Sequence, residues 1–346
     1  MRLIVPHPGH FAALKEIIEN KEAWGLKDVA EVYMAGSPDV MGSGRATLHA
    51  PLIEDIKEQT AYAHQHHIRM NIVTNPSCMG GYHLTFEGYK MFGWYFEQLN
   101  KADVDGVTVA EPYLVELLKD FPMETVISCV AHVDSLQRAE FFEDLGADTI
   151  TVDTNINRNF GVLEAIMSAV NCNVRILVNE GCLYKCPFRY SHFNLFSHIT
   201  ASRSSQLLNA RAQPLNIFGD YYFDKCISIR VRDPSQIIRS PWLRPEDMKE
   251  YEVIGVKDFK ISGRANTVNW ILNCMRAYSN RSYEGNLLDL LDCPAELKDM
   301  FFIDNDGLEG AIKQWKGCKK ICEECRYCDE LTSKVVGVIK SEERNR

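Results

Sequence analysis

The chain has 346 residues, with 38 Lys or Arg against 47 Asp or Glu, and its formal net charge at pH 7 is −9. A hydrophobic content of 46% and a charged content of 25% are typical of a globular protein, and no apolar run reaches the 18 residues that a membrane span needs. The acidic balance argues against broad, sequence-independent binding of nucleic acid. Binding of one particular nucleic acid is kept as an alternative.

The chain contains 12 cysteines, and its first residues form too short an apolar run for a signal peptide. Free cysteines in this number indicate a reducing compartment. We therefore expect a cytoplasmic protein without membrane association.

Short apolar runs alternate with helical patterns over the first 280 residues. The predicted strands cover residues 2–6, 29–35, 69–75, 106–110, 124–131, 149–153, 174–179 and 258–263. The predicted helices cover residues 11–20, 52–67, 87–102, 113–121, 136–145, 162–170 and 267–278. Near-continuous apolar strands separated by helices predict a (β/α)8 TIM-like barrel, a fold of ~250 residues. An open doubly wound sheet is the alternative, but no Gly-x-Gly-x-x-Gly turn follows the first strand.

Two segments interrupt this regular pattern. About 78 residues separate the seventh and eighth predicted strands, far more than an ordinary loop. We assign residues 183–257 to a functional insertion in a barrel of residues 1–280. Residues 183–264 are locally basic, with 13 Lys or Arg against 8 Asp or Glu. Residues 281–346 form a cysteine-rich tail.

Four cysteines are expected on loops at the C-terminal face of the barrel, namely Cys78, Cys182, Cys186 and Cys226. Closely spaced thiols in a reducing compartment favour metal or iron–sulfur ligation over disulfides. The Cys186-Pro187 step is similar to the end of a ferredoxin ligand run. We therefore predict a [4Fe-4S] cluster on these four residues. The alternative for Cys78 is a free thiol, with the fourth iron open to a substrate.

Three further cysteines are expected to be small buried hydrophobic residues. They are Cys129 within the fifth strand, Cys172 before the seventh strand and Cys274 on the last barrel helix.

The tail carries Cys318, Cys322, Cys325 and Cys328 within eleven residues. One continuous run of four cysteines favours a second [4Fe-4S] cluster, because zinc sites usually draw on two separated pairs. A structural zinc ion and a split of these cysteines between sites are the alternatives. The first three also match the cluster motif of radical S-adenosylmethionine enzymes. That motif normally follows the first barrel strand, whereas here it follows the last.

Polar residues stand where most predicted strands end, which is where (β/α)8 barrels place their chemistry. These residues are His7, Ser37, Asn75, Glu111, His132, Asp153, Asn155, Glu180 and Arg264. We predict catalytic roles for Glu180, His7, His132, Asp153 and Glu111. For Glu180 the alternative is a hydrogen bond that fixes the cysteine loop.

Candidate substrate-binding residues are Asn75, Arg189, Lys260 and Arg264. Arginine suits bidentate binding of carboxylate or phosphate. We therefore expect an anionic small molecule, or an anionic group on a macromolecule that the protein modifies.

Residues 179–189, His192-Phe193-Asn194, Cys226, Ser240-Pro241-Trp242 and residues 259–264 together resemble the collagenase-like peptidase U-32 family. The resemblance covers roughly residues 1–280 and implies a TIM-barrel-like domain with a cysteine-bound [4Fe-4S] cluster. Better-understood relatives take part in oxygen-independent hydroxylation of ubiquinone precursors and RNA bases, and others are labelled peptidases. Relatives generally space their first two cluster cysteines more widely, and the four-cysteine tail is not a general family feature.

The sequence thus predicts an iron–sulfur oxidoreductase, with oxygen-independent hydroxylation as its reaction. The alternatives are a U-32-type peptidase, a radical S-adenosylmethionine enzyme, and a non-catalytic iron–sulfur subunit or scaffold. The last of these would serve a partner protein, and an oxidoreductase would need an electron donor. Neither Gly-x-Ser-x-Gly nor His-Glu-x-x-His occurs in the chain, so the common serine and zinc peptidase motifs are missing.

Overall fold

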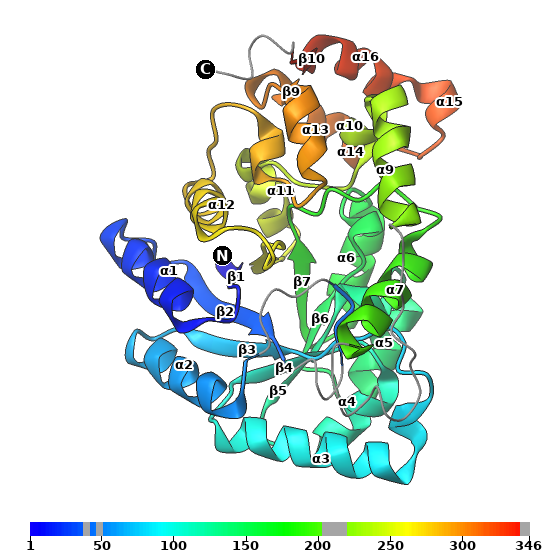
Figure 1. Cartoon of the computed structure of the whole chain (residues 1–346). Helices are drawn as coiled ribbons and strands as arrows, with labels where there is room; N and C mark the ends of the chain where they lie inside the picture. The colour runs from blue at the N-terminus through cyan, green and yellow to red at the C-terminus, as the bar shows by residue number, and fades with distance from the viewer. Residues whose placement is uncertain (37–41, 46–50, 203–219, 340–346) are drawn as a thin grey trace.

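Eight parallel strands close into a barrel in their order along the chain. The structure is a computed structural model that describes residues 1–36, 42–45, 51–202 and 220–339, and Figure 1 shows the strands with helices outside them. The strands are β1 (Arg2–Pro6), β2 (Val29–Ala35), β3 (Arg69–Val73), β4 (Gly106–Val109), β5 (Glu124–Ile127), β6 (Thr149–Thr151), β7 (Asn173–Leu177) and β8 (Asp258–Lys260). Because β1 pairs with both β2 and β8, the predicted (β/α)8 barrel is confirmed.

Helices follow the strands and cover the outside of the barrel. They are α1 (Phe11–Ala23), α2 (Ile53–Gln65), α3 (Phe86–Lys101), α4 (Pro112–Leu118), α5 (Leu136–Asp144), α6 (Phe160–Ala169) and α12 (Val268–Asn280). In α3 the Thr85 side chain accepts a hydrogen bond from Gly88 N, and Phe92, Phe96 and Leu99 are buried on one face. No described helix has the length and apolar character needed to cross a membrane.

Several strands end earlier than predicted. Cys129, which we placed inside the fifth strand, lies in the short helix η2 (Cys129–Ala131), because β5 already ends at Ile127. Ser128 Oγ accepts a hydrogen bond from Val130 N at 3.2 Å, and this local contact turns the backbone out of the sheet. Of the other two cysteines expected in the core, Cys274 is buried, whereas Cys172 is only partly buried.

The insertion follows β7. Its described helices are α7 (Arg189–Ser202), α9 (Tyr221–Arg232), α10 (Ser235–Arg239), η4 (Pro245–Asp247) and α11 (Met248–Val253). Residues 203–219 of the predicted insertion, and the strand-end candidate Ser37, lie outside the described residues.

The tail packs on the insertion and shares its core with the barrel (Figure 1). It consists of η5 (Leu287–Leu290), α13 (Ala295–Met300), β9 (Phe301–Ile303), η6 (Asp306–Leu308), α14 (Ala311–Lys316), α15 (Cys322–Cys325), α16 (Tyr327–Val335) and β10 (Val336–Val338). The Arg158 guanidinium, which comes from the barrel loop before α6, lies 4.4 Å from the Trp242 ring centroid and 3.6 Å from that of Trp315. It also donates to Ile238 O at 2.7 Å and Trp242 O at 3.0 Å. One barrel side chain therefore holds the insertion and the tail together.

An ionic layer fills the N-terminal half of the barrel interior. Arg175 on β7 donates to both Glu31 carboxylate oxygens, at 2.9 and 3.2 Å, and to Asp258 Oδ2 at 3.3 Å. All three residues are almost fully buried. Burial alone would lower the pKa of Arg175, but the Glu31 and Asp258 carboxylates raise it. In this layer the negative charges of the carboxylates therefore compensate the buried positive charge of Arg175.

Candidate functional site

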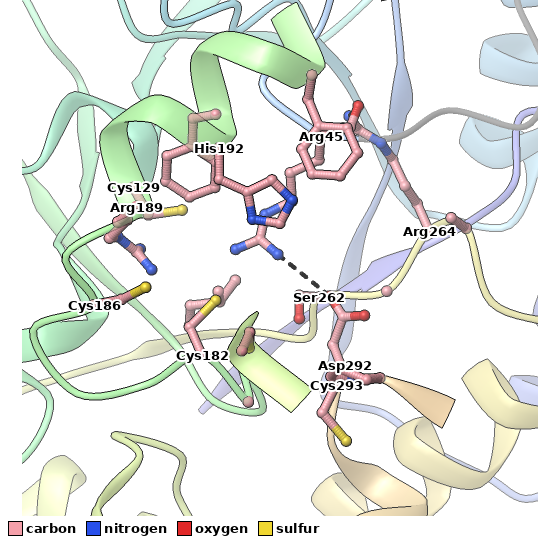
Figure 2. A pocket seen from close by; sticks show the side chains of 18 of the residues that line it. Arg45, Cys129, Cys182, Cys186, Arg189, His192, Ser262, Arg264, Asp292 and Cys293 are labelled. Atoms are coloured by element: carbon pink, nitrogen blue, oxygen red, sulfur yellow. Dashed lines mark hydrogen bonds and ion pairs between the residues drawn. The ribbon is translucent and has the colours of Figure 1, made fainter. Parts of the chain in front are cut away.

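A cavity of about 400 Å³ lies at the C-terminal ends of the strands. The barrel contributes Tyr33 from β2, Leu177 from β7 and Lys260 from β8, and the insertion contributes aromatic residues that include Phe188 and Tyr222. This is the end of the barrel where the strand-end analysis placed the chemistry. Figure 2 shows a close view of its side chains.

Five cysteines line this cavity, namely Cys129, Cys182, Cys186, Cys226 and Cys293. The last of these is a residue that the sequence analysis did not consider. Cys78 lies on the loop after β3 and is not among the described residues that line the cavity. The structure therefore places Cys293 where we expected Cys78. The signal in the sequence was a second Cys-Pro step, Cys293-Pro294, like that of Cys186-Pro187.

Backbone hydrogen bonds hold the Cys182 loop against the Cys293 loop. Gly181 N donates to Asp292 O at 3.1 Å, and Asp292 N donates to Asn179 O at 2.9 Å. A Cβ atom on Gly181 would stand 2.6 Å from Cys293 Cβ, so only glycine allows this approach. In Figure 2 the Cys182 and Cys186 thiols face the cavity, while Cys293 lies at its rim with the sulfur turned away from Cys182.

A buried arginine accompanies the thiols. Arg230, one turn after Cys226 on α9, donates hydrogen bonds to Cys226 Sγ and to Gly181 O. Burial raises the pKa values of Cys182 and Cys186, and it raises that of Cys293 to about 12. These three thiols are therefore protonated at neutral pH in the metal-free chain, and a metal that bound them would release protons.

Two arginine side chains hold the Glu180 carboxylate. It is buried, it accepts a hydrogen bond from Arg189 Nη1 at 2.5 Å, and it forms an ion pair with Arg45 Nη2 at 2.9 Å. Although burial opposes ionisation, the two guanidinium groups hold the pKa of Glu180 well below its usual range. A carboxylate in this state cannot donate a proton near pH 7. The geometry favours the alternative role of fixing the cysteine loop, because the Cys182 thiol also hydrogen-bonds to Glu180.

All four predicted substrate-binding residues line the cavity, namely Asn75, Arg189, Lys260 and Arg264. Arg45 joins them and was missed, since it follows no predicted strand and belongs to no motif. Arg264 donates to Ser43 Oγ and, at 3.4 Å, to Arg45 O, which are both neutral oxygens. Among the described residues, Arg264 therefore has no hydrogen bond to a carboxylate, and it adds positive charge to the cavity.

The other predicted catalytic residues are not among the described residues that line the cavity. His7 is buried, its Nδ1 accepts from Gly9 N at 3.1 Å, and burial lowers its pKa to about 3. Glu111 caps α4 by accepting from Tyr113 N at 2.7 Å. Local backbone N–H groups thus engage His7 Nδ1 and the Glu111 carboxylate, while His7 Nε2 is buried without a hydrogen-bond partner among the described residues.

His132 and Asp153 form a buried pair behind the cavity wall. His132 Nδ1 lies 2.7 Å from Asp153 Oδ2, and Arg189 Nε lies 3.8 Å from the same oxygen. The His132 bond is the main cause that lowers the pKa of Asp153 against burial. This pair therefore supports Arg189 from the side opposite to Glu180.

A second histidine pair, which we did not predict, reaches the cavity. His192 on α7 lines it, and His192 Nε2 lies 2.8 Å from Asp220 Oδ2. A carboxylate in this position orients an imidazole ring.

The tail cysteines, Cys318, Cys322, Cys325 and Cys328, lie outside this cavity. Cys325 is exposed and the other three are partly buried. Tyr184, which sits between Cys182 and Cys186 in the chain, has its pKa raised by burial and by the nearby Cys318 and Cys322. Lys320 Nζ in the tail also lies 5.5 Å from the Tyr184 ring centroid, so the 182–186 loop lies near the tail cysteine group as well as lining the cavity.

Within the described residues, no three His, Cys, Asp or Glu side chains converge as the ligands of one metal ion. A single zinc ion holds sulfur at ~2.3 Å and draws its ligands close together. In a four-iron cluster each cysteine binds a different iron, so the thiols stand further apart.

Two sequence comparisons with known proteins identify one family. The sequence model of Peptidase family U32 matches residues 18–284. The chain is 44% identical over 342 residues to "Uncharacterized protease MJ1657" of Methanocaldococcus jannaschii, a match covering 96% of this chain and 98% of that protein. A solved structure described as that of the U32 peptidase Mk0906 superposes with a TM-score of 0.55 at 24% identity, covering 76% of this chain and 93% of that one. At this identity the structural match supports the fold alone.

Proposed function

The chain belongs to peptidase family U32, and we propose that it is an iron–sulfur enzyme that acts on an anionic substrate at the barrel mouth. The proposed ligands of the [4Fe-4S] cluster are Cys182, Cys186, Cys226 and Cys293. The observation that carries the proposal is that four thiols from three separate segments line one cavity.

The donor set fits such a cluster. Four thiolates are what a [4Fe-4S] cluster requires, and Arg230 places a buried positive charge against Cys226 to balance their negative charge. Rotation about the Cα–Cβ bond of Cys293 would turn its sulfur toward the other three. When bound by these four cysteines, the cluster would supply electron transfer.

The remaining cavity residues would bind and orient the substrate. Arg264 would bind its anionic group, since it has no carboxylate partner among the ion pairs of the described residues, and Lys260 would contact the substrate beside it. Arg45 and Arg189 would hold Glu180, and through it the cysteine loop. Phe188 and Tyr222 would restrict water at the site.

Anaerobic purification followed by iron analysis tests the barrel cluster. We expect Cys293→Ser to lose most of about four irons per chain, and Cys78→Ser, the matched control, to keep them. A chain that stays iron-free after anaerobic reconstitution would contradict the proposal, as would equal iron loss in the two variants.

We also propose a second [4Fe-4S] cluster on Cys318, Cys322, Cys325 and Cys328. Its place beside Tyr184 supports a role in passing electrons to the barrel site from an external donor. About eight irons in total would support this proposal, whereas four irons with one zinc would assign zinc to the tail.

A cysteine peptidase is the second candidate, favoured by the His192–Asp220 pair at a cysteine-lined cavity. Such an enzyme needs a thiol within hydrogen-bond reach of the histidine. Among the hydrogen bonds of the described residues, none joins His192 to a thiol. Peptide cleavage by the metal-free chain that His192→Ala abolishes would favour this candidate over the iron–sulfur enzyme. If neither reaction is found but a second protein co-purifies in fixed stoichiometry, a non-catalytic subunit would be favoured.

A further inference from the structure

Lys260 is a buried lysine without an acidic partner. It is the last residue of β8, it is 6% exposed, and it lines the cavity. Its Nζ lies 3.9 Å from the centroid of the Tyr33 ring. Among the described residues no ion pair joins it to an Asp or Glu. By contrast, Arg175, the buried cation in the layer below, has two carboxylates.

The surroundings of Lys260 favour the uncharged amine. Burial is the main cause that lowers its pKa to about 7. Arg175 and Arg264 lower the pKa further, whereas Glu31 and Cys129 oppose them. A neutral lysine amine is a nucleophile, and carbonyl groups are its usual targets in enzymes.

An anion site adjoins this amine. Arg264, four residues later in the chain, lines the same cavity, and its hydrogen bonds among the described residues go to neutral oxygens, on Ser43 and Arg45. Its guanidinium therefore keeps its full charge for a ligand, and carboxylate is the group that it binds best. An amine and a free guanidinium in one cavity match a molecule that carries a carbonyl beside a carboxylate.

We propose that Lys260 forms an imine with a 2-oxo acid, while Arg264 binds the carboxylate. Nζ attacks the carbonyl carbon and a C–N bond forms. The carbonyl oxygen leaves as water with the two amine protons, so the step needs no oxidant or reductant. The inference names the substrate class of the proposed active site and rests on that site being the cavity, but imine formation itself does not require the cluster.

Reductive trapping tests the proposal directly. The anaerobically purified chain, with its metal bound, is incubated with pyruvate and sodium cyanoborohydride, and its peptides are mapped by mass spectrometry. We expect the reduced adduct on Lys260. Lys260→Arg should abolish it, whereas Lys257→Arg, which changes an exposed lysine three residues earlier, should leave it unchanged. Lactate, which lacks the carbonyl, should give no adduct, and acetone, which lacks the carboxylate, should give far less than pyruvate.

Two further measurements separate a specific site from random modification. Arg264→Gln should lower trapping at limiting pyruvate on the order of tenfold, the effect of losing one charge-assisted hydrogen bond. In the wild type the trapping rate should level off above about pH 8. An ordinary lysine would continue to react faster up to about pH 10.

Iron analysis of the same samples distinguishes the two proposals. An adduct on Lys260 in an iron-free chain would overturn the cluster and support the imine. Full iron with no adduct, or with adducts spread equally over Lys260 and Lys257, would overturn the imine.

Discussion

The two ends of the barrel interior use the same kinds of charged residue in opposite ways. At the N-terminal end Arg175 is surrounded by Glu31 and Asp258, and its donors are directed at carboxylates. At the C-terminal end Lys260 has an aromatic ring for a partner, and within the described part of the chain Arg264 donates to neutral oxygens. Compensated charge holds the barrel together, whereas uncompensated charge at equal depth is a place for a ligand.

Replacing Arg175 or Lys260, the buried cations at the two ends of the barrel, should produce the largest difference in stability between variants. Arg175→Met leaves two buried carboxylates without a partner and should lower the free energy of unfolding by about 3–5 kcal/mol. Lys260→Met removes an amine that lacks a carboxylate partner and should be nearly neutral or stabilising. Urea unfolding of both variants measures the difference. Equal losses would mean that Lys260 belongs to the structural network.

The pH dependence of stability sharpens the same comparison. The folded-state pKa of Lys260 is about 7, below the ordinary value of 10.5, so between these values the unfolded chain binds the proton that the folded chain has released. Stability should therefore rise with pH in this window, by about 1.4 kcal/mol per pH unit for this group alone. Lys260→Met should remove that slope, whereas Lys257→Met should not. Parallel curves for all three proteins would refute a lowered pKa.

Substitution of Gly181 tests whether the C-terminal end of the barrel depends on the close approach of the Cys182 loop to the Cys293 loop. Gly181→Ala places a methyl group against Cys293 and should cost about 1–3 kcal/mol of stability, together with iron. Gly93→Ala is the matched control, because a Cβ there meets nothing within 4 Å and the residue lies inside α3. That variant should gain roughly 0.5–1 kcal/mol from helix propensity. The idea fails if Gly181→Ala retains wild-type iron and stability.

The smallest effect is expected at the outer edge of the N-terminal layer. Arg2 Nε lies 2.6 Å from Asp258 Oδ1, but the Arg2 side chain is 49% exposed. Arg2→Gln should therefore cost less than about 1 kcal/mol, because water replaces the lost contact. A loss comparable to that of Arg175→Met would show that the layer extends to the surface.

The fold followed from the sequence more readily than the site did. Apolar runs mark parallel strands wherever they occur, because both faces of such strands are buried. They do not mark where a strand stops, and the hydrogen bond that Ser128 Oγ accepts from Val130 N accompanies the turn that places Cys129 outside β5. Strand-end reasoning found Arg264 and Glu180 because the barrel brings those positions together.

The same reasoning failed where residues approach from elsewhere in the chain. Cys293 comes from beyond the barrel, and only the closed fold brings it to Cys182. Arg45 lies in a segment without a periodic pattern. For His7 and Glu111 the strand-end position was correct, but nearby backbone N–H groups donate to His7 Nδ1 and to the Glu111 carboxylate. A one-dimensional pattern does not reveal that competition.

Arg158 of the barrel packs against Trp242 of the insertion and Trp315 of the tail. These contacts can form only after all three segments have been synthesised. Strands β1–β7 leave the ribosome first, and they can begin to pair before the rest of the chain exists. Cys293, and the tryptophan that secures the tail, are synthesised only after β8. The cavity is therefore completed late in biosynthesis, because its lining residues extend to Ala295.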